Sequence, residues 1–86
     1  MEKMNAGFTI VQEEFYETET GCRHGIALGC KSTRFGDEWV TWGFTESDGT
    51  GERGYYWGHY FCGWVAATKD YHDRLSKEYG RLLGGE

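Results

Sequence analysis

Four stretches in the first two thirds of the chain carry the alternating pattern of strands. Residues 8–16, 24–31, 38–45 and 55–61 are rich in β-branched and aromatic side chains, and turn residues separate them. A slip in the alternation at Ile10-Val11 indicates a β-bulge. Consecutive strands joined by short connections predict an antiparallel meander of four strands.

The pattern changes to a helical period from about Gly63 to Tyr79. Apolar positions follow the i, i+3, i+4, i+7 rule at Trp64, Ala67, Thr68, Tyr71, Leu75, Tyr79 and Leu82. We place Lys69, Asp70, Asp73, Arg74 and Lys77 on the polar side, and Glu78 at the solvent edge. The predicted fold is α+β: a four-stranded antiparallel meander followed by one C-terminal amphipathic helix (β-β-β-β-α), in a single domain over residues 1–86.

Alternation also predicts which side chains the helix covers. Ile26 and Leu28 share one face of their strand, while Gly25, Ala27 and Gly29 make the other face small. We assign Val40, Trp42, Trp57, Phe61 and Trp64 to the helix core together with Ile26 and Leu28. A sheet with one helix needs only one apolar face. Trp39, Tyr56 and Tyr60 then fall on the opposite face and are candidate partner-binding residues.

The acidic residues are segregated along the chain, whose net charge is −5. Residues 1–60 hold ten acids and five bases, and residues 61–86 hold four of each. Like charge disfavours direct binding to a nucleic-acid backbone and favours a basic protein surface. Acids that would ring the three aromatics complete the predicted partner-binding set: Asp37, Glu38, Glu46, Asp48 and Glu52. The alternative is that these acids only keep a small domain soluble.

Candidate metal and catalytic residues do not form a recognisable pattern. Cys22-x-His24 and His59-x-x-Cys62 supply metal-ligand types, and Cys30 is a fifth candidate. In a meander the two pairs lie at opposite ends of strands about 23 Å long, which is too far apart for one ion. The sequence has no nucleophile elbow and no Gly-rich oxyanion loop. We therefore expect no metal, no cofactor and no enzymatic activity.

The chain also carries hints of its location. Residues 1–7 have no apolar signal-peptide region, and no run approaches the roughly 20 apolar residues of a membrane span. Three cysteines cannot all pair internally, which favours free thiols in a reducing compartment. We expect a cytoplasmic protein without membrane contact.

Three segments resemble a group of small proteins from bacterial mobile genetic elements, such as plasmids, conjugative elements and phages. They are Ile26-Ala27-Leu28-Gly29, Trp39-Val40-Thr41-Trp42 and Tyr56-Trp57-Gly58-His59-Tyr60-Phe61, followed by a charged helix. The similarity covers roughly residues 24–75. We know no catalytic motif for the group, so the resemblance assigns no functional residue. Small acidic proteins of such elements include inhibitors similar to anti-CRISPR proteins, which occupy the nucleic-acid-binding surface of a nuclease.

These observations support one leading hypothesis and two alternatives. The first is a non-enzymatic acidic protein that occupies a basic surface of a partner, such as a host nucleic-acid-processing or defence enzyme. The second is a small nucleic-acid-binding accessory domain that stacks bases on sheet aromatics. The third is a structural homodimer that buries its aromatic face against a second copy.

Overall fold

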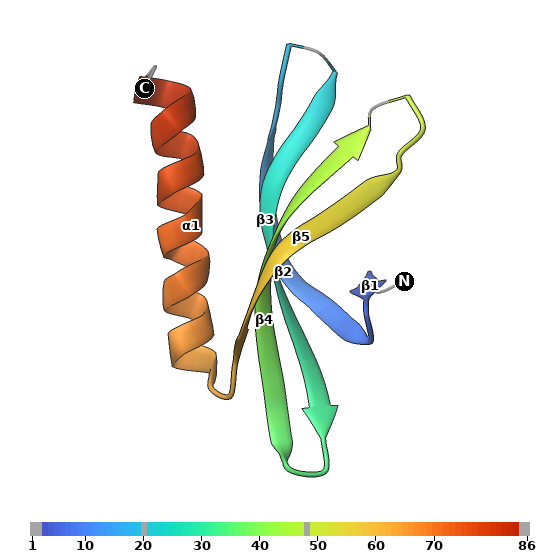
Figure 1. Ribbon diagram of the computed structural model, residues 1–86, viewed down its shortest axis with the longest axis vertical. Coiled ribbons are helices and arrows are strands. Elements are labelled where there is room, and N and C mark those ends of the chain that lie inside the picture. The colour runs from blue at the N-terminus through green and yellow to red at the C-terminus, as the bar shows by residue number, and fades with distance from the viewer. Residues whose placement is uncertain (1–2, 20, 48, 85–86) are drawn as a thin grey trace.

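The computed structural model describes residues 3–19, 21–47 and 49–84, with side chains described as far as Glu78. Its elements are β1 (Met4–Asn5), β2 (Phe8–Glu17), β3 (Cys22–Thr33), β4 (Gly36–Ser47), β5 (Arg53–Phe61) and α1 (Trp64–Gly84). The strands form one antiparallel sheet in the order β1-β2-β3-β4-β5, and α1 lies along one side of it (Figure 1). The predicted α+β meander with a C-terminal helix is confirmed. The predicted number of strands is wrong by one, because β1 precedes the four expected strands.

A tight turn and a bulge shape the N-terminal part of the sheet. β1 pairs with β2 through Met4↔Thr9 and Asn5↔Phe8, after a tight turn in which Ala6 and Gly7 both have positive φ. The register of β2 against β3 shifts between Ile10 and Gln12, which confirms the bulge predicted at Ile10-Val11. A bulge increases the local twist of a strand, so β2 bends where its alternation slips.

Large and small side chains alternate between the two central strands. Ile26 lies opposite Gly43, whereas Ala27 lies opposite Trp42. Residues directly opposite in an antiparallel ladder point to the same face. On each face of the sheet, the large side chains of one strand therefore lie beside the small side chains of the other.

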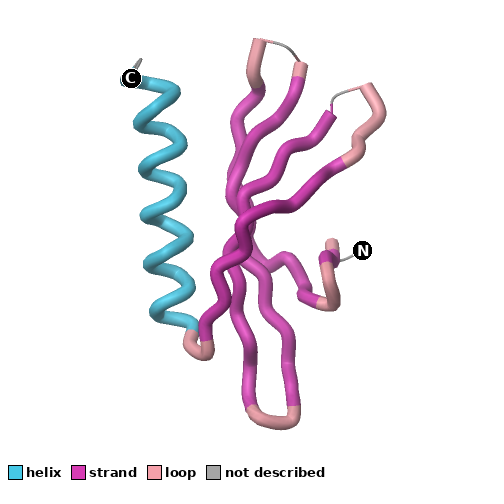
Figure 2. Tube along the Cα trace, in the orientation of Figure 1, coloured by secondary structure: helices cyan, strands magenta, loops and turns pink. Residues whose placement is uncertain are grey.

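The helix covers the face that carries Ile26 and Leu28. Figure 2 shows α1 alongside the sheet. Ala67, Tyr71 and Leu75 of α1 are buried against these two residues, as the helical stripe predicted. Trp64, at the start of the stripe, is 56% exposed. Tyr79 and Leu82 lie outside the residues whose side chains are described. Within the described part of the chain, no helix is both long and apolar enough to cross a membrane.

A second core fills the opposite face. Phe8, Val40 and Trp42 are buried there, with Ile10 and Tyr55 packed against them. The rings of Phe8 and Tyr55 lie 5.6 Å and 5.2 Å from the Trp42 ring, measured between centroids. The prediction that Val40 and Trp42 pack under the helix is therefore wrong. Their row faces away from α1 because the register pairs it with Gly25, Ala27 and Gly29.

The sheet is curled around this second core. Phe8 on β2 and Tyr60 on β5 have ring centroids 6.0 Å apart, although β3 and β4 lie between their strands. Three strand spacings in a flat sheet would separate these strands by about 14 Å. We call this side the concave face and the side under α1 the helix face. Three of the sheet aromatics thus have a structural use, because Phe8, Trp42 and Tyr55 pack together inside the curl.

Candidate functional site

The three aromatic residues predicted to form one binding surface do not share a face. Trp39 and Tyr56 lie on the helix face, where Trp39 packs on the helix core and the Tyr56 ring covers Gly43. Tyr60 lies on the concave face and is 63% exposed. The cause is a second bulge, in which Trp57 and Gly58 together oppose Trp42, so the alternation of β5 reverses. The prediction that these rings are neighbours is wrong.

The predicted acidic ring is also divided. Asp37 and Glu38 are exposed beside the turn between β3 and β4, at one end of the sheet. Glu46 and Glu52 flank the turn between β4 and β5, at the other end (Figure 1). Asp48 lies outside the described residues. The carboxylates therefore form two separate groups instead of one rim.

Arg53 of β5 joins two acids from different strands on the concave face. Its Nη1 lies 2.6 Å from Oε1 of Glu13, and its Nη2 lies 2.7 Å from Oε1 of Glu46. The guanidinium lies 3.9 Å from the centroid of the Phe44 ring. Burial acts to lower the pKa of Arg53, but its hydrogen bonds with Glu13, Tyr55 and Glu46 outweigh burial and raise it. The same cluster lowers the pKa of Glu46, first through its hydrogen bond with Arg53.

Several acids at this end of the sheet have no cation paired with them among the described residues. Arg23 is held by Glu17 at 3.1 Å and by Glu46 at 2.9 Å, so the arginines of β3 and β5 are both engaged. Three further acids are exposed and form no ion pair with a described residue: Glu14, Glu19 and Glu52. We call the end of the molecule that carries Glu14, Glu17, Glu19, Glu46 and Glu52 the acidic end.

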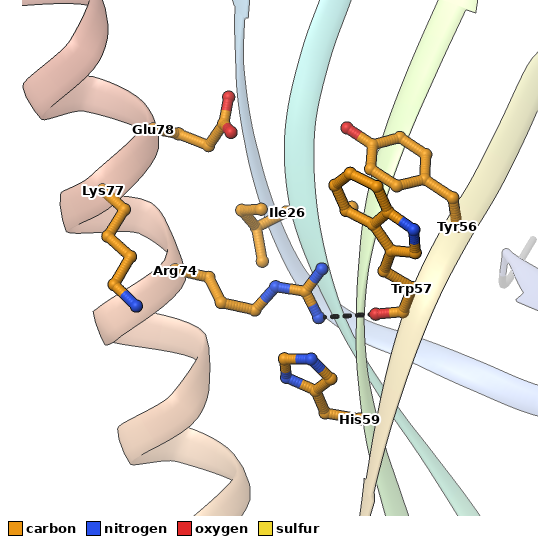
Figure 3. A pocket seen from close by; sticks show the side chains of 8 residues that line it. Ile26, Tyr56, Trp57, His59, Arg74, Lys77 and Glu78 are labelled. Carbon is orange, nitrogen blue, oxygen red and sulfur yellow. Dashed lines mark hydrogen bonds between the residues drawn. The ribbon is translucent and has the colours of Figure 1, made fainter.

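A cleft of about 250 Å³ separates α1 from β5 (Figure 3). Its walls are Tyr56, Trp57 and His59 of β5 and Arg74, Lys77 and Glu78 of α1, over a floor that includes Ile26 and Gly43. Arg74, predicted on the polar side of the helix, instead reaches across to the sheet. Its Nη1 donates to the carbonyl oxygen of Trp57 at 2.8 Å.

A polar network closes one end of this cleft. The Thr41 hydroxyl, which is fully buried on β4, donates to Oδ2 of Asp70 at 2.5 Å. His59 Nδ1 lies 2.9 Å from the same oxygen. Arg74 Nη1 donates to both the carbonyl and the hydroxyl oxygen of Thr41, each at 3.1 Å. Asp70 was also predicted on the polar side, and these contacts turn it toward the sheet. Asp70 thereby orients the His59 ring.

This network predicts a loss of stability in acid. Burial acts to raise the pKa of Asp70, but hydrogen bonds from Thr41 and His59 and the charges of His59 and Arg74 outweigh burial and lower it. The stabilisation is therefore complete above the unfolded-state pKa, near 3.9, and is lost as pH falls through the lower folded-state value. We expect Asp70→Asn to cost about 1–2 kcal/mol at pH 7. Urea unfolding between pH 7 and pH 3 should show this cost shrinking in acid, and a cost independent of pH would contradict the assignment.

The cysteines and histidines of the predicted metal pattern are dispersed. Cys22 begins β3, Cys30 lies near its other end, and Cys62 is exposed after β5. His24 stacks on Tyr16, with ring centroids 5.9 Å apart. Among the described residues, no group of three or more His, Cys, Asp or Glu side chains is arranged to hold a metal ion.

Comparison of the chain with protein-family models, with curated proteins and with solved structures finds no match. The geometry of the acidic end and of the cleft is therefore what guides a functional proposal.

Proposed function

We propose that the protein is a non-enzymatic binding protein whose acidic end occupies a basic surface of a partner protein in the cytoplasm. The partner we propose is a nucleic-acid-processing or defence enzyme, whose substrate-binding surface must itself attract phosphates. The protein would then act as an inhibitor, in the manner of an anti-CRISPR protein.

One observation carries the proposal. The bases nearest the acidic end are engaged in internal ion pairs, since Arg53 is only 11% exposed and Arg23 contacts two glutamates. Meanwhile Glu14, Glu19 and Glu52 are exposed. Charges arranged in this way present a negative field to solvent, because the cations are compensated by internal ion pairs. Such a field accelerates association with a basic surface and selects against acidic ones.

An apolar anchor lies at the same end of the sheet, on the concave face with Glu17 and Glu46, whereas Glu14 lies on the helix face. Phe15 of β2 is 43% exposed, and the Arg23 guanidinium lies 5.5 Å from the centroid of its ring. Interfaces commonly combine a large aromatic contact with a polar rim. The proposed surface therefore centres on Phe15 and the acidic end, in place of Trp39, Tyr56 and Tyr60.

Matched charge variants test this proposal. The variant Glu14→Gln/Glu19→Gln/Glu52→Gln removes three exposed charges from the acidic end. The control Asp37→Asn/Glu38→Gln/Asp73→Asn removes three exposed charges elsewhere. We expect the first to weaken partner binding by about 10-fold or more, because rim charges contribute through long-range attraction, and the control to change it by less than about 2-fold.

Binding is measured by pull-down from a bacterial lysate at low and high salt, followed by titration of the purified partner. Salt should weaken the complex, because it screens exposed charges. Added DNA should release the partner if its nucleic-acid-binding surface is the one occupied. Recovery of no basic partner, binding indifferent to salt, or equal loss in both variants would each contradict the proposal.

A further inference from the structure

The bulge in β5 places a strained aromatic residue at the rim of the cleft. Trp57 has a φ of 52°, in the left-handed region that costs a residue with a side chain about 1–2 kcal/mol. Its side chain is 78% exposed, so burial repays little of that cost. The Tyr56 ring packs edge-on against it, with centroids 5.1 Å apart. The backbone, fixed by the bulge and by Arg74, holds the indole at the mouth of the cleft (Figure 3).

The opposite wall presents hydrogen-bond donors that have no acceptor among the described residues. All three hydrogen bonds of the Arg74 side chain come from Nη1, and no described residue accepts from its Nε or its other terminal nitrogen. Lys77 lines the same cleft, is exposed, and forms no ion pair with a described residue. Glu78 also lines it, but its Oε2 accepts a hydrogen bond from Tyr16 at 3.1 Å. Arg74 and Lys77 thus face an exposed indole, and the charges of Asp70 and Glu78 compensate part of the charge of Arg74.

The size of the cleft limits its ligand. A volume of about 250 Å³ suits a single ring system that carries one small charged group, and it lies just below the usual range of ligand pockets. A ring can stack on the indole, and an anionic group gains charge-assisted hydrogen bonds from a guanidinium and an ammonium. A longer nucleic acid is disfavoured by the net charge of −5 on the protein.

We propose that this cleft binds a small planar aromatic anion, with its ring against Trp57 and its carboxylate or phosphate on Arg74 and Lys77. The site is separate from the acidic end, so it does not depend on the proposed partner binding.

Four probes test both parts of the recognition. AMP and benzoate carry a ring and an anionic group, adenosine lacks the anionic group, and inorganic phosphate lacks the ring. Tryptophan fluorescence and the NMR shift of the Trp57 indole N–H follow binding. We expect AMP or benzoate to saturate with a Kd of about 1 mM or tighter. Adenosine and inorganic phosphate should each bind about 10-fold more weakly. The comparison of AMP with adenosine measures what the phosphate adds, and saturation by benzoate shows that a carboxylate is also accepted. If neither saturates, or if adenosine matches AMP, the proposal is overturned.

Two variants and a control locate the site. Lys77→Ala should weaken binding about 10-fold, as expected for a lost charge-assisted hydrogen bond, whereas Lys69→Ala, on an exposed part of the same helix, should leave it unchanged. Trp57→Asn should abolish binding while the melting temperature stays equal or rises, because asparagine tolerates the left-handed conformation. Retained binding in Trp57→Asn, or equal losses in the two lysine variants, would overturn the proposal. A fall in the melting temperature of Trp57→Asn would show that the indole is structural and would also count against it.

Discussion

Replacing Gly25 with alanine is expected to destabilise the protein by about 3 kcal/mol, the upper part of the usual range for overpacking. A Cβ at this position would lie 2.3 Å from the backbone oxygen of Glu14, 2.6 Å from Cζ of Phe44 and 2.7 Å from Cβ of Phe15. Only the Phe44 atom is the end of a side chain, and this fully buried ring is confined by Phe15, Tyr55 and Arg53. Relief therefore requires β2 to move away from β3, which strains their ladder.

Thermal and urea unfolding of Gly25→Ala measure this cost. A loss of 3 kcal/mol in a chain of this size lowers the melting temperature by about 12 °C or more. Gly54→Ala is the matched control, because Gly54 also lies within a strand but has nothing within 4 Å of the added carbon. Its stability should change by less than about 0.5 kcal/mol. Equal effects of the two substitutions would show that strand propensity, and not the close approach at Gly25, sets the cost.

Arg53→Met is expected to cost about 2–4 kcal/mol, because it leaves Glu13 and Glu46 partly buried without their shared partner. Both carboxylates keep one other ion pair, to Lys3 and Arg23 respectively, so the loss is smaller than for an isolated buried charge. The aliphatic part of methionine retains the packing on Phe44. The substitution Arg53→Met thus measures the electrostatic contribution of Arg53 to stability separately from the contribution of its packing.

The dependence of this cost on pH gives a second readout. In the parent protein the pKa values of Glu13 and Glu46 are lowered, in both cases against the effect of burial. Their stabilisation is present above the unfolded-state pKa, near 4.3, and is lost as pH falls through the lower folded-state values. The cost of Arg53→Met should therefore shrink below about pH 4, and adding Glu13→Gln/Glu46→Gln should recover part of it at pH 7. Arg34→Met, at an exposed arginine without an ion pair among the described residues, should cost less than about 0.5 kcal/mol. A cost that stays constant with pH would contradict the role of the carboxylates.

Much of the fold is readable from local pattern. The contrast of Ile26 and Leu28 with Gly25, Ala27 and Gly29 identifies the face under the helix. The helical stripe identifies Ala67, Tyr71 and Leu75, and the slip at Ile10-Val11 identifies the first bulge. These features can be predicted because each depends on the residues of a single strand or helix.

Which side chains of β4 and β5 lie under the helix depends on how these strands pair with their neighbours. Both faces of β4 carry a tryptophan, so the alternation of β4 does not show which face the helix covers. The register shows it, because Trp42 lies opposite Ala27. An isolated glycine within a strand often indicates a bulge. Gly58 is such a glycine in β5, so the sequence contains a signal for this bulge. The bulge reverses the positions of the predicted site aromatics, which is why Tyr56 and Tyr60 separate.

The cleft was not predicted because its polar wall looks like a solvated helix surface in sequence. Asp70 and Arg74 are four residues apart, in the order that stabilises an isolated helix. They turn inward because the helix face of β4 offers the Thr41 hydroxyl and carbonyl as hydrogen-bond partners. The bare backbone at Gly43 leaves room beside them for the Tyr56 ring.

The curl of the sheet has a mechanical consequence. β2 and β5 meet across the concave face through side chains, including the Phe8–Tyr60 ring contact and the Glu13–Arg53 ion pair, while β3 and β4 are joined along their whole length by a backbone ladder. Flattening the sheet separates the first set of contacts without breaking any strand pairing. The molecule is thus stiff along its strands and compliant across them, and its curvature is the coordinate along which it deforms most easily.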